Sequence, residues 1–382
     1  MKKIAIVHDW FVTFAGAEKV VQQMLQVFPQ AELFSLIDFL SPKDRALLGN
    51  AAIRTSFLQN APFVKEYYRL YLALMPLAIE QMDVSSYELV ISSCHAVAKG
   101  VISGPEQLHI SYIYTPIRYA WEMQNEYLNT SGLGSLKDTT ARVLLHYVRN
   151  WDVVAASRPD RLAAISKFVA RRIQKTYRRD AHVIYPPVDT EYFTPLTGEG
   201  QREDFFLAAS RLVPYKRIDL IAEAFQSMPE KKLVIIGDGP EAAKIERLRG
   251  PNITWLGYQP DDVLRDYMRR CRAFIFAAKE DFGIMPLEAQ ACGAPVIAYG
   301  AGGVRETVPA LGGTEPPTGI HYPEQSVAAI RAAVEAFERA RNRFSPEACR
   351  RNAERFSNER FREEFRAFTL SAWDDFVGKG NS

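Results

Sequence analysis

The chain has 382 residues, 47% hydrophobic and 24% charged, and Lys+Arg 47 nearly balance Asp+Glu 45. This composition is typical of globular proteins and excludes disordered and fibrous classes, while a net charge of +2 indicates no nucleic-acid partner. The 4 cysteines lie far apart, which argues against a disulfide framework or a structural zinc site and fits a reducing compartment. We therefore expect a cytoplasmic protein of two or three domains.

The apolar runs are too short to cross a bilayer. Residues 4–7 are too few for the apolar part of a secretory leader. The longest uncharged run, 289–304, contains glycines and a proline and falls short of the ~18 apolar residues of a membrane span.

Peripheral contact with the inner membrane surface stays open at two segments. Residues 64–82 combine basic and aromatic side chains, which indicates either a core-facing helix broken near Pro76 or a surface that touches lipid. Residues 137–180 hold eleven Lys/Arg against four Asp, which indicates either attraction to anionic lipid or a solvated helical face.

Short β-branched runs alternate with helical patterns along the whole chain. Strands are expected at 3–7, 31–37, 89–92, 109–114, 161–165 and 183–185, with a first helix at 17–28. Prolines and glycines crowd into 186–200, which is typical of a linker. Strands resume at 205–209, 233–236, 253–255, 273–276 and 296–298. This pattern predicts an α/β protein with two doubly wound parallel sheets.

The domain boundaries follow from this pattern. We expect a first domain at 1–192, a second at 193–360 and a separate helix at 361–382, where Phe361, Phe365 and Phe368 recur at helical spacing. Ligands bind outside the carboxyl ends of the strands in such sheets, so the default site is the cleft between the domains.

The segment 280–288 carries the strongest chemical signal. Glu280 and Glu288 flank Gly283, which permits close approach of a ligand, and Pro286, which suits the first turn of a helix. Amides at such a helix start favour a phosphate, and the two carboxylates can accept hydrogen bonds from sugar hydroxyls. The alternative is that the two carboxylates only complement the helix dipole and face solvent.

A second segment supplies positive charge. Arg211 and Lys216 follow the strand 205–209, and a guanidinium fork with an ammonium group can hold a diphosphate. A solvated basic loop is the alternative for this segment.

Other motifs are weaker. Gly237, Gly239 and Ala242 match a dinucleotide fingerprint, but Pro240 removes an amide, and we interpret the segment as a turn before a helix. In the first βα turn a single Gly16 precedes the helix. The histidines show no metal-binding spacing and no Asp-x-Asp pair occurs, so we expect no metal ion. His95 follows a strand and can face either the cleft or the core.

Taken together, these motifs resemble retaining glycosyltransferase family 4, of GT-B fold. The resemblance rests on the run 280–288, in which seven residues separate two glutamates, on Arg211 with Lys216, on Gly302-Gly303 and on the hinge-like run 183–193. Within the family, the run 113–122 looks like mannosyltransferases of bacterial O-antigen and exopolysaccharide assembly.

The resemblance implies roles for named residues. Arg211 and Lys216 would hold the donor diphosphate, Glu280 the transferred sugar and Glu288 the ribose. The remaining implied donor contacts are at Gly16, Tyr258, Phe282, Gly283, Ile284 and Met285.

On the acceptor side we place His95, Tyr114 and Arg118. Relatives often carry His where this chain has Tyr114, and Gly-Gly where it has Ala15-Gly16. The last helix of the family returns to the amino-terminal domain, which the stripe at 361–376 fits.

The function we expect is transfer of a hexose, with mannose from GDP-mannose as the preferred choice, onto a lipid-linked saccharide or glycan in bacterial surface polysaccharide synthesis. The nucleotide sugar is a substrate, and neither a cofactor nor a metal is expected. The alternatives are a UDP-sugar donor, an NAD-dependent oxidoreductase, a sugar-nucleotide epimerase and a non-catalytic nucleotide- or carbohydrate-binding protein.

Overall fold

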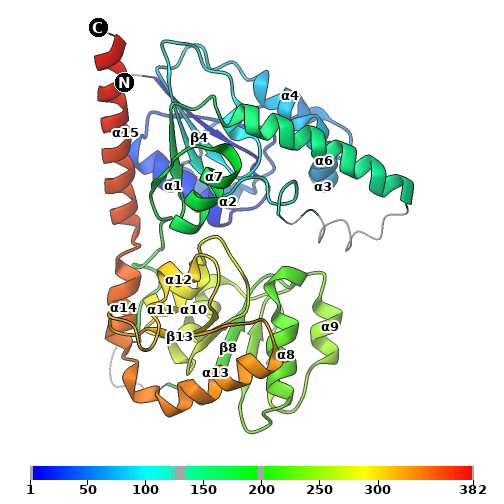
Figure 1. The fold of residues 1–382 in the computed structure, drawn as a ribbon, viewed down its shortest axis with the longest axis vertical. Coiled ribbons are helices and arrows are strands. Elements are labelled where there is room, and N and C mark those ends of the chain that lie inside the picture. The colour runs from blue at the N-terminus through cyan, green and yellow to red at the C-terminus, as the bar shows by residue number, and fades with distance from the viewer. Residues whose placement is uncertain (1–2, 123, 125–134, 197–201, 381–382) are drawn as a thin grey trace. The chain divides into compact units, whose positions relative to one another are not determined.

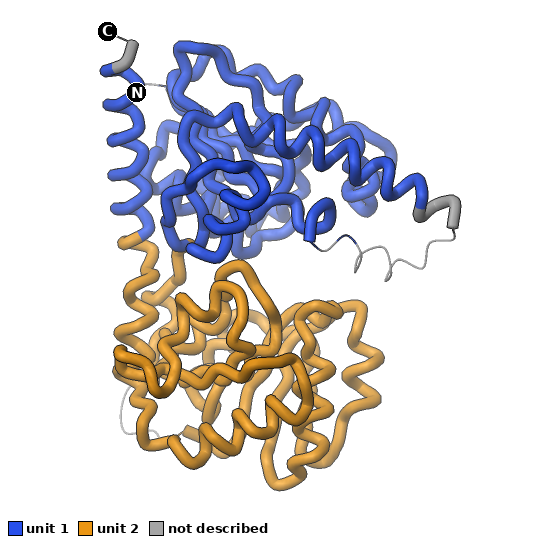
Figure 2. The backbone as a smooth tube through the Cα atoms, in the orientation of Figure 1, with its two compact units in different colours: residues 1–185, 361–382 blue, residues 186–360 orange. Residues whose placement is uncertain are grey.

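The computed structural model describes residues 3–122, 124, 135–196 and 202–380 (Figure 1). Contacts divide the chain into two units, one of residues 1–185 with 361–382 and one of residues 186–360 (Figure 2). Residues 197–200 of the expected linker lie outside the described ranges.

The first unit is built on a parallel seven-stranded sheet in the order β3-β2-β1-β4-β5-β6-β7. Ile6 of β1 pairs with Leu33 of β2 and with Ile91 of β4. The strands are β1 (Ile4–His8), β2 (Glu32–Ser35), β3 (Ile53–Thr55), β4 (Leu89–Cys94), β5 (Leu108–Ile113), β6 (Arg161–Ala164) and β7 (His182–Val183). The helices are α1 (Gly16–Val27), α2 (Pro42–Ala46), α3 (Val64–Tyr67), α4 (Met75–Glu80), α6 (Ser135–Ala155) and α7 (Lys167–Tyr177), with 3-10 turns η1 (Phe57–Asn60), η2 (Tyr68–Ala73) and η3 (Ala98–Gly100).

The second unit is built on a six-stranded sheet in the order β10-β9-β8-β11-β12-β13. Leu207 of β8 pairs with Val234 of β9 and with Phe274 of β11, all in parallel. The strands are β8 (Phe206–Ala209), β9 (Leu233–Ile236), β10 (Ile253–Trp255), β11 (Phe274–Phe276), β12 (Val296–Tyr299) and β13 (Gly319–Tyr322). The helices are α8 (Ile218–Gln226), α9 (Ala242–Arg247), α10 (Asp261–Arg270), α11 (Ile284–Ala291), α12 (Val304–Thr307), α13 (Val327–Arg339) and α14 (Pro346–Glu354), with 3-10 turns η4 (Pro214–Lys216) and η5 (Arg341–Arg343).

Both faces of the second sheet are buried. Phe274 and Phe276 pack on one face, and Ile275 between them packs on the other, as the alternation of strand side chains requires. Continuous apolar strands are typical of parallel sheets that helices cover on both sides. The two Rossmann-like α/β sheets expected from the sequence are confirmed.

The last helix, α15 (Asn358–Gly380), contributes to the core of the first unit. Phe361 and Phe365 are fully buried and meet the ring of Tyr112 edge-on, at centroid distances of 5.8 and 6.2 Å. Arg362 donates to the Gln23 side chain at 2.7 Å. Residues 361–380 therefore supply apolar surface that the first sheet needs.

Three details differ from the expectations. The boundary predicted at 192–193 falls at 185–186, because Val188 pairs with Ser357 and Tyr192 packs against the second core. Pro76 lies in the first turn of α4 and does not break a longer helix, since the segment 64–80 forms two short helices separated by η2. The short strands β3 and β13 were not expected from the sequence.

Candidate functional site

The strand order of each sheet reverses at one point. In the second unit the reversal falls between β8 and β11, which are neighbours although β9 and β10 follow β8 in the chain. Loops that leave two strands at such a switch point diverge and create a binding crevice at the carboxyl ends. The loops after β8 and β11 carry Arg211, Lys216 and Glu280.

An ion pair joins these two loops. The Lys216 ammonium contacts the Glu280 carboxylate, and both side chains are mostly shielded from solvent. Lys216 ends η4, and Arg217 then takes a left-handed backbone conformation with φ of 54° that turns the chain into α8. Arg211 is exposed. The structure thus brings the predicted cation and the predicted sugar-binding carboxylate together.

Two glycines fix the backbone of Glu280. Residue 280 forms a parallel bridge with Gly302, and the Gly303 amide donates to the Glu280 carbonyl at 2.9 Å. A Cβ on Gly302 would overlap that carbonyl, and a Cβ on Gly303 would overlap the backbone of Phe282. Only glycine lets the two loops lie this close.

The start of α11 is shaped by another glycine. Gly283 has φ of 91° at the amino end of the helix, and Ile284 and Met285 form its first turn. Glu288 is buried within the helix, and Phe282 is buried before it.

A buried amide network anchors α11. The Gln290 side chain donates to the Thr307 carbonyl at 3.1 Å and accepts from the Asn352 side chain at 2.7 Å. This network ties α11 to α12 and α14, so the helix that carries Glu288 is held on two sides.

The Gly237–Gly239 turn connects neighbouring loops. The Leu212 amide donates to the Asp238 carbonyl at 2.9 Å, and the Gly237 amide donates to the Gly257 carbonyl at 2.8 Å. The Gly239 amide donates to the Asp238 side chain at 2.7 Å. Because these amides have internal acceptors, the segment is a packing turn, as the sequence interpretation held.

Next to this turn, Tyr258 has a side chain 76% exposed. Gly257 lies in the left-handed region with φ of 68°, and the Trp255 indole donates to the Gly237 carbonyl at 2.9 Å. The exposed ring therefore stands on a loop fastened to the turn beside Arg211. Its role toward a base stays a prediction.

In the first unit the switch point falls between β1 and β4. The buried Asp9 carboxylate after β1 accepts the main-chain amides of His95 (2.6 Å), Ala96 (2.9 Å), Val97 (2.6 Å) and Ala98 (2.7 Å). The Nδ1 atom of His95 lies 3.1 Å from the same carboxylate. One carboxylate thereby shapes the whole loop after β4.

Burial and nearby charges shift the pKa values of Asp9 and His95. Burial by itself would raise the pKa of Asp9, but His95 and His8, with the amide hydrogen bonds, hold it below its ordinary value. Burial lowers the pKa of His95 despite the opposing effect of Asp9. The ring of His95 packs edge-on against Trp10 at 4.4 Å.

A chain of hydrogen bonds through His8, Ser93 and Tyr114 lies beside His95. His8 Nδ1 is 3.0 Å from the Ser93 hydroxyl, which is 3.0 Å from the Tyr114 hydroxyl. Tyr114 in turn donates to the Ala17 carbonyl at 3.1 Å, so it joins β5 to the first turn of α1. Burial raises the pKa of Tyr114 well above its ordinary value, and the phenol stays protonated. Gly16 is the first residue of that helix.

The structure therefore groups His95 with Tyr114, whose rings are 6.2 Å apart. Arg118 instead approaches Glu122, with its Nε atom 4.0 Å from the carboxylate. Asp9 is the site residue whose role the sequence did not reveal, because its bonds reach residues 86 or more positions away. Whether the residues of the two units share a cleft stays a prediction.

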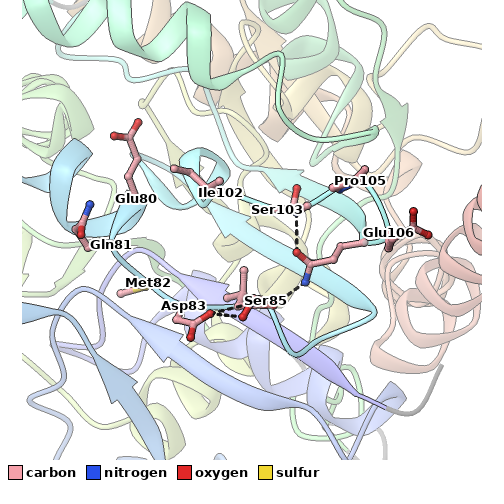
Figure 3. Close-up of a pocket in the computed structure, with 12 residues that line it drawn as sticks. Glu80, Gln81, Met82, Asp83, Ser85, Ile102, Ser103, Pro105 and Glu106 are labelled. Carbon is pink, nitrogen blue, oxygen red and sulfur yellow. Dashed lines mark hydrogen bonds between the residues drawn. The ribbon is translucent and has the colours of Figure 1, made fainter.

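A 520 Å³ cavity lies elsewhere in the first unit (Figure 3). It is lined by residues 80–85 and 102–107, which precede β4 and β5, so it opens at the amino ends of these strands. The Gln107 side chain bridges the two segments by donating to the Val84 carbonyl at 2.6 Å. This cavity is therefore not part of the candidate site.

Within the described ranges, no three His, Cys, Asp or Glu side chains gather as metal ligands. In the same part of the chain, no helix is long and apolar enough to span a membrane. The four cysteines are buried, and burial raises the pKa of each thiol to about 12. We assign them no nucleophilic role.

The fold is shared with solved glycosyltransferases. A HepE protein of Anabaena in complex with UDP aligns with a TM-score of 0.69 at 18% identity, covering 97% of this chain and 100% of the other. Sucrose-phosphate synthase of Thermosynechococcus elongatus aligns with a TM-score of 0.71 at 15% identity, covering 98% and 100%. These likenesses identify the fold as the GT-B class.

Part of the chain is similar to a known family. Residues 195–356 match the family described as "Glycosyl transferases group 1". This match lies within the second unit, which carries the Lys216–Glu280 pair.

Two curated proteins are similar to part of this chain. An uncharacterized glycosyltransferase of Methanocaldococcus jannaschii is 27% identical over 225 residues, which is 56% of this chain and 62% of that protein. A GDP-mannose-dependent monoacylated alpha-(1-6)-phosphatidylinositol monomannoside mannosyltransferase of Corynebacterium glutamicum is 31% identical over 182 residues, 40% of this chain and 48% of that protein. The chain spans less than two thirds of either relative.

Proposed function

We propose that this chain is a retaining glycosyltransferase that moves a hexose from a nucleotide diphosphate sugar. The observation that carries the proposal is the pairing of Lys216 with Glu280 across the switch point of a group 1 domain. A diphosphate needs cations, and sugar hydroxyls need a carboxylate acceptor, and this site presents both at one sheet edge.

The mechanism we propose rests on charge stabilisation. The bond between the anomeric carbon and the diphosphate oxygen breaks, and a bond to the acceptor oxygen forms on the same face of the sugar. The acceptor proton passes to an oxygen of the departing diphosphate. Arg211 and Lys216 stabilise the negative charge that builds on that group, with no metal ion required.

The ion pair also explains the order of events at the site. Before the donor binds, Glu280 neutralises Lys216. The donor diphosphate supplies a stronger anionic partner, so Lys216 turns to it and the carboxylate becomes available to the sugar hydroxyls. Binding of the correct donor therefore releases Glu280 from Lys216, and Glu280 can then orient the sugar.

Mannose from GDP-mannose is the donor that we favour, and the GDP-mannose-dependent relative of Corynebacterium glutamicum supports it. A UDP-sugar is the second candidate, which the HepE complexes with UDP and UDP-glucose support. An NAD-dependent oxidoreductase gains no support, because the Gly237 and Gly239 amides that a pyrophosphate would need have internal acceptors.

For the acceptor we propose a lipid-linked saccharide or glycan of bacterial surface polysaccharide synthesis, met at the cytoplasmic face of the inner membrane. Support comes from a run of exposed apolar side chains at 57–77 of the first unit, in which Phe63 and Leu70 are 77% and 78% exposed. We define the apolar face as Phe57, Phe63, Tyr67, Leu70, Leu74 and Leu77. Lys65 and Arg69 lie in the same segment, and such a basic-apolar surface is typical of proteins that lie on anionic bilayers.

A thermal-shift panel with UDP, GDP, ADP and their sugars tests the proposal. We expect stabilisation by GDP and GDP-mannose, and loss of that stabilisation in Lys216→Ala. A shift with NAD alone would overturn it. Product formed from the donor without any acceptor would instead indicate an epimerase.

A further inference from the structure

Four cations follow β5 and β6 at the carboxyl edge of the first sheet, and two of them, Arg118 and Arg172, contact the Glu122 carboxylate. They come from the loop after β5 and from the first two turns of α7. We define the Arg172 cluster as Arg118, Glu122, Lys167, Arg171 and Arg172.

Two half-buried arginines of the cluster, Arg118 and Arg172, share one partner. A terminal nitrogen of Arg172 forms an ion pair with Glu122, and Nε of Arg118 lies 4.0 Å from the same carboxylate oxygen. Arg172 also donates to the Thr115 hydroxyl at 3.3 Å. Its side chain is only 13% exposed, whereas that of Glu122 is 42% exposed. The guanidinium is therefore fixed, while the carboxylate can move aside.

An aromatic ring orients the cluster further. The guanidinium carbon of Arg172 lies 4.3 Å from the ring centroid of Phe168, and that of Arg171 lies 5.8 Å from it. Stacking on a ring holds the planar fork without using its hydrogen-bond donors. Two forks held this way are preorganised for an anion with several oxygen atoms.

The charge pattern of α7 is unfavourable for the helix itself. Its eleven residues include Lys167, Arg171, Arg172 and Lys175, and none of the eleven is acidic. Cations in the first turns of a helix are repelled by the positive amino end of the helix dipole. Positions where a sequence breaks such a local rule are expected at functional sites. An anion beside the cluster would offset this repulsion.

We propose that the Arg172 cluster binds a phosphate or diphosphate group carried by the acceptor. The inference rests on the proposed function, because it names the chemistry of that acceptor. The donor diphosphate has its own cations, Arg211 and Lys216, in the other unit. The cluster lies on the same sheet edge as Tyr114, since Thr115 and Arg118 follow it directly. An acceptor held by its phosphate at Arg172 would extend along the edge that carries His95 and Tyr114.

Binding of inorganic pyrophosphate, measured by calorimetry, tests the cluster. All proteins carry Arg211→Ala and Lys216→Ala, which remove the proposed donor cations. We expect Arg172→Gln to weaken pyrophosphate binding at least tenfold and Lys167→Gln, at an exposed position, to weaken it severalfold. Lys175→Gln removes the same charge from the far end of α7 and serves as the control. Equal affinity in all three variants would overturn the proposal.

Two further arms make the result specific. Retention on vesicles that contain phosphatidic acid, lost in Arg172→Gln, would identify a lipid phosphate as the ligand. Loss of pyrophosphate binding without a change on vesicles would identify a soluble phosphate ester. In Arg172→Gln with Arg211 and Lys216 intact, we expect nucleotides to raise the melting temperature as much as in the parent protein. This measurement tests the donor site alone, so a failure of the proposed function can be distinguished from a failure of the Arg172 cluster.

Discussion

The Asp9 carboxylate lies 3.1 Å from Nδ1 of His95 and accepts the main-chain amide of the same residue at 2.6 Å. A single buried anion thus sets both the backbone and the ring orientation of His95. The second unit shows the same arrangement at its own switch point, where Lys216 contacts Glu280. In each sheet an electrostatic contact closes the gap between the diverging loops.

Replacing Asp9 by Asn is expected to destabilise the first unit by about 3 kcal/mol or more, because hydrogen bonds to a buried charge contribute roughly 1.5–3 kcal/mol each. Urea unfolding at pH 7 measures the loss. Asp83→Asn, at an exposed carboxylate bonded to Ser85, is the matched control and should lose much less. Equal losses in the two variants would contradict the anchoring role of Asp9.

His109 makes the first unit sensitive to acid. Burial, with Arg179 and Arg158 nearby, lowers the pKa of His109 from 6.5 to about 3. Between these values the unfolded chain takes up a proton that the folded chain does not. The free energy of unfolding therefore falls as the pH drops below 6.5, by about 1.4 kcal/mol per pH unit from this group.

Unfolding of His109→Gln at pH 7, 6 and 5 checks this dependence. Gln keeps a partner for the Ser92 hydroxyl, which lies 2.9 Å from His109 Nε2, and we expect the acid slope to be shallower than in the parent protein. His146→Gln, at an exposed histidine, should leave the slope unchanged. A parent-like slope in His109→Gln would show that this residue is not the source.

Gly302 holds Glu280 in place. In Gly302→Ala the new Cβ would overlap the Glu280 carbonyl, so we expect a loss of sugar transfer of a hundredfold or more, as misplaced catalytic groups show. Gly312→Ala is the control, because Gly312 has a similarly positive φ of 91° and its added Cβ meets nothing within 4 Å. Both variants carry backbone strain, and only the first moves Glu280. Similar activity in the two would refute this positioning.

Variants of Glu280 and Lys216 should affect sugar transfer and nucleotide binding differently. Glu280→Gln is expected to retain nucleotide affinity and lose transfer, whereas Lys216→Ala should weaken nucleotide diphosphate binding about tenfold, or about 1.4 kcal/mol. Calorimetry and initial rates of the two variants distinguish these effects. Normal turnover by Glu280→Gln would reject its role toward the sugar.

The apolar face can be tested on vesicles. Leu70→Ser removes one of its most exposed side chains, and we expect weaker pelleting with anionic vesicles, since the gain from burying a Leu side chain is about 1.5–3 kcal/mol. Leu370→Ser, on α15 of the same unit and also exposed, is the control. Unchanged pelleting of Leu70→Ser would exclude this face as the contact.

The sequence predicted the parallel sheets well, because long apolar runs and helical periodicity are local signals. It missed β3 and β13, because Arg54 in β3 and Gly319 with His321 in β13 interrupt the apolar run that marks the other strands. It placed Arg211, Lys216 and Glu280 after the correct strands, since a strand end followed by charge is also local. The hydrogen bonds from the amides of residues 95–98 to Asp9 leave no periodic pattern in the sequence. They could be found only from the folded structure.

The chain passes from one unit to the other twice, at 185–186 and again at 360–361. During synthesis, the residues of the second unit are therefore complete before the last helix has emerged. Until then Tyr112 lacks the rings of Phe361 and Phe365, and an apolar surface of the first sheet stays open to water. The core of the first unit, which holds the start of the chain, is therefore complete only after residues 361–380 have been synthesised.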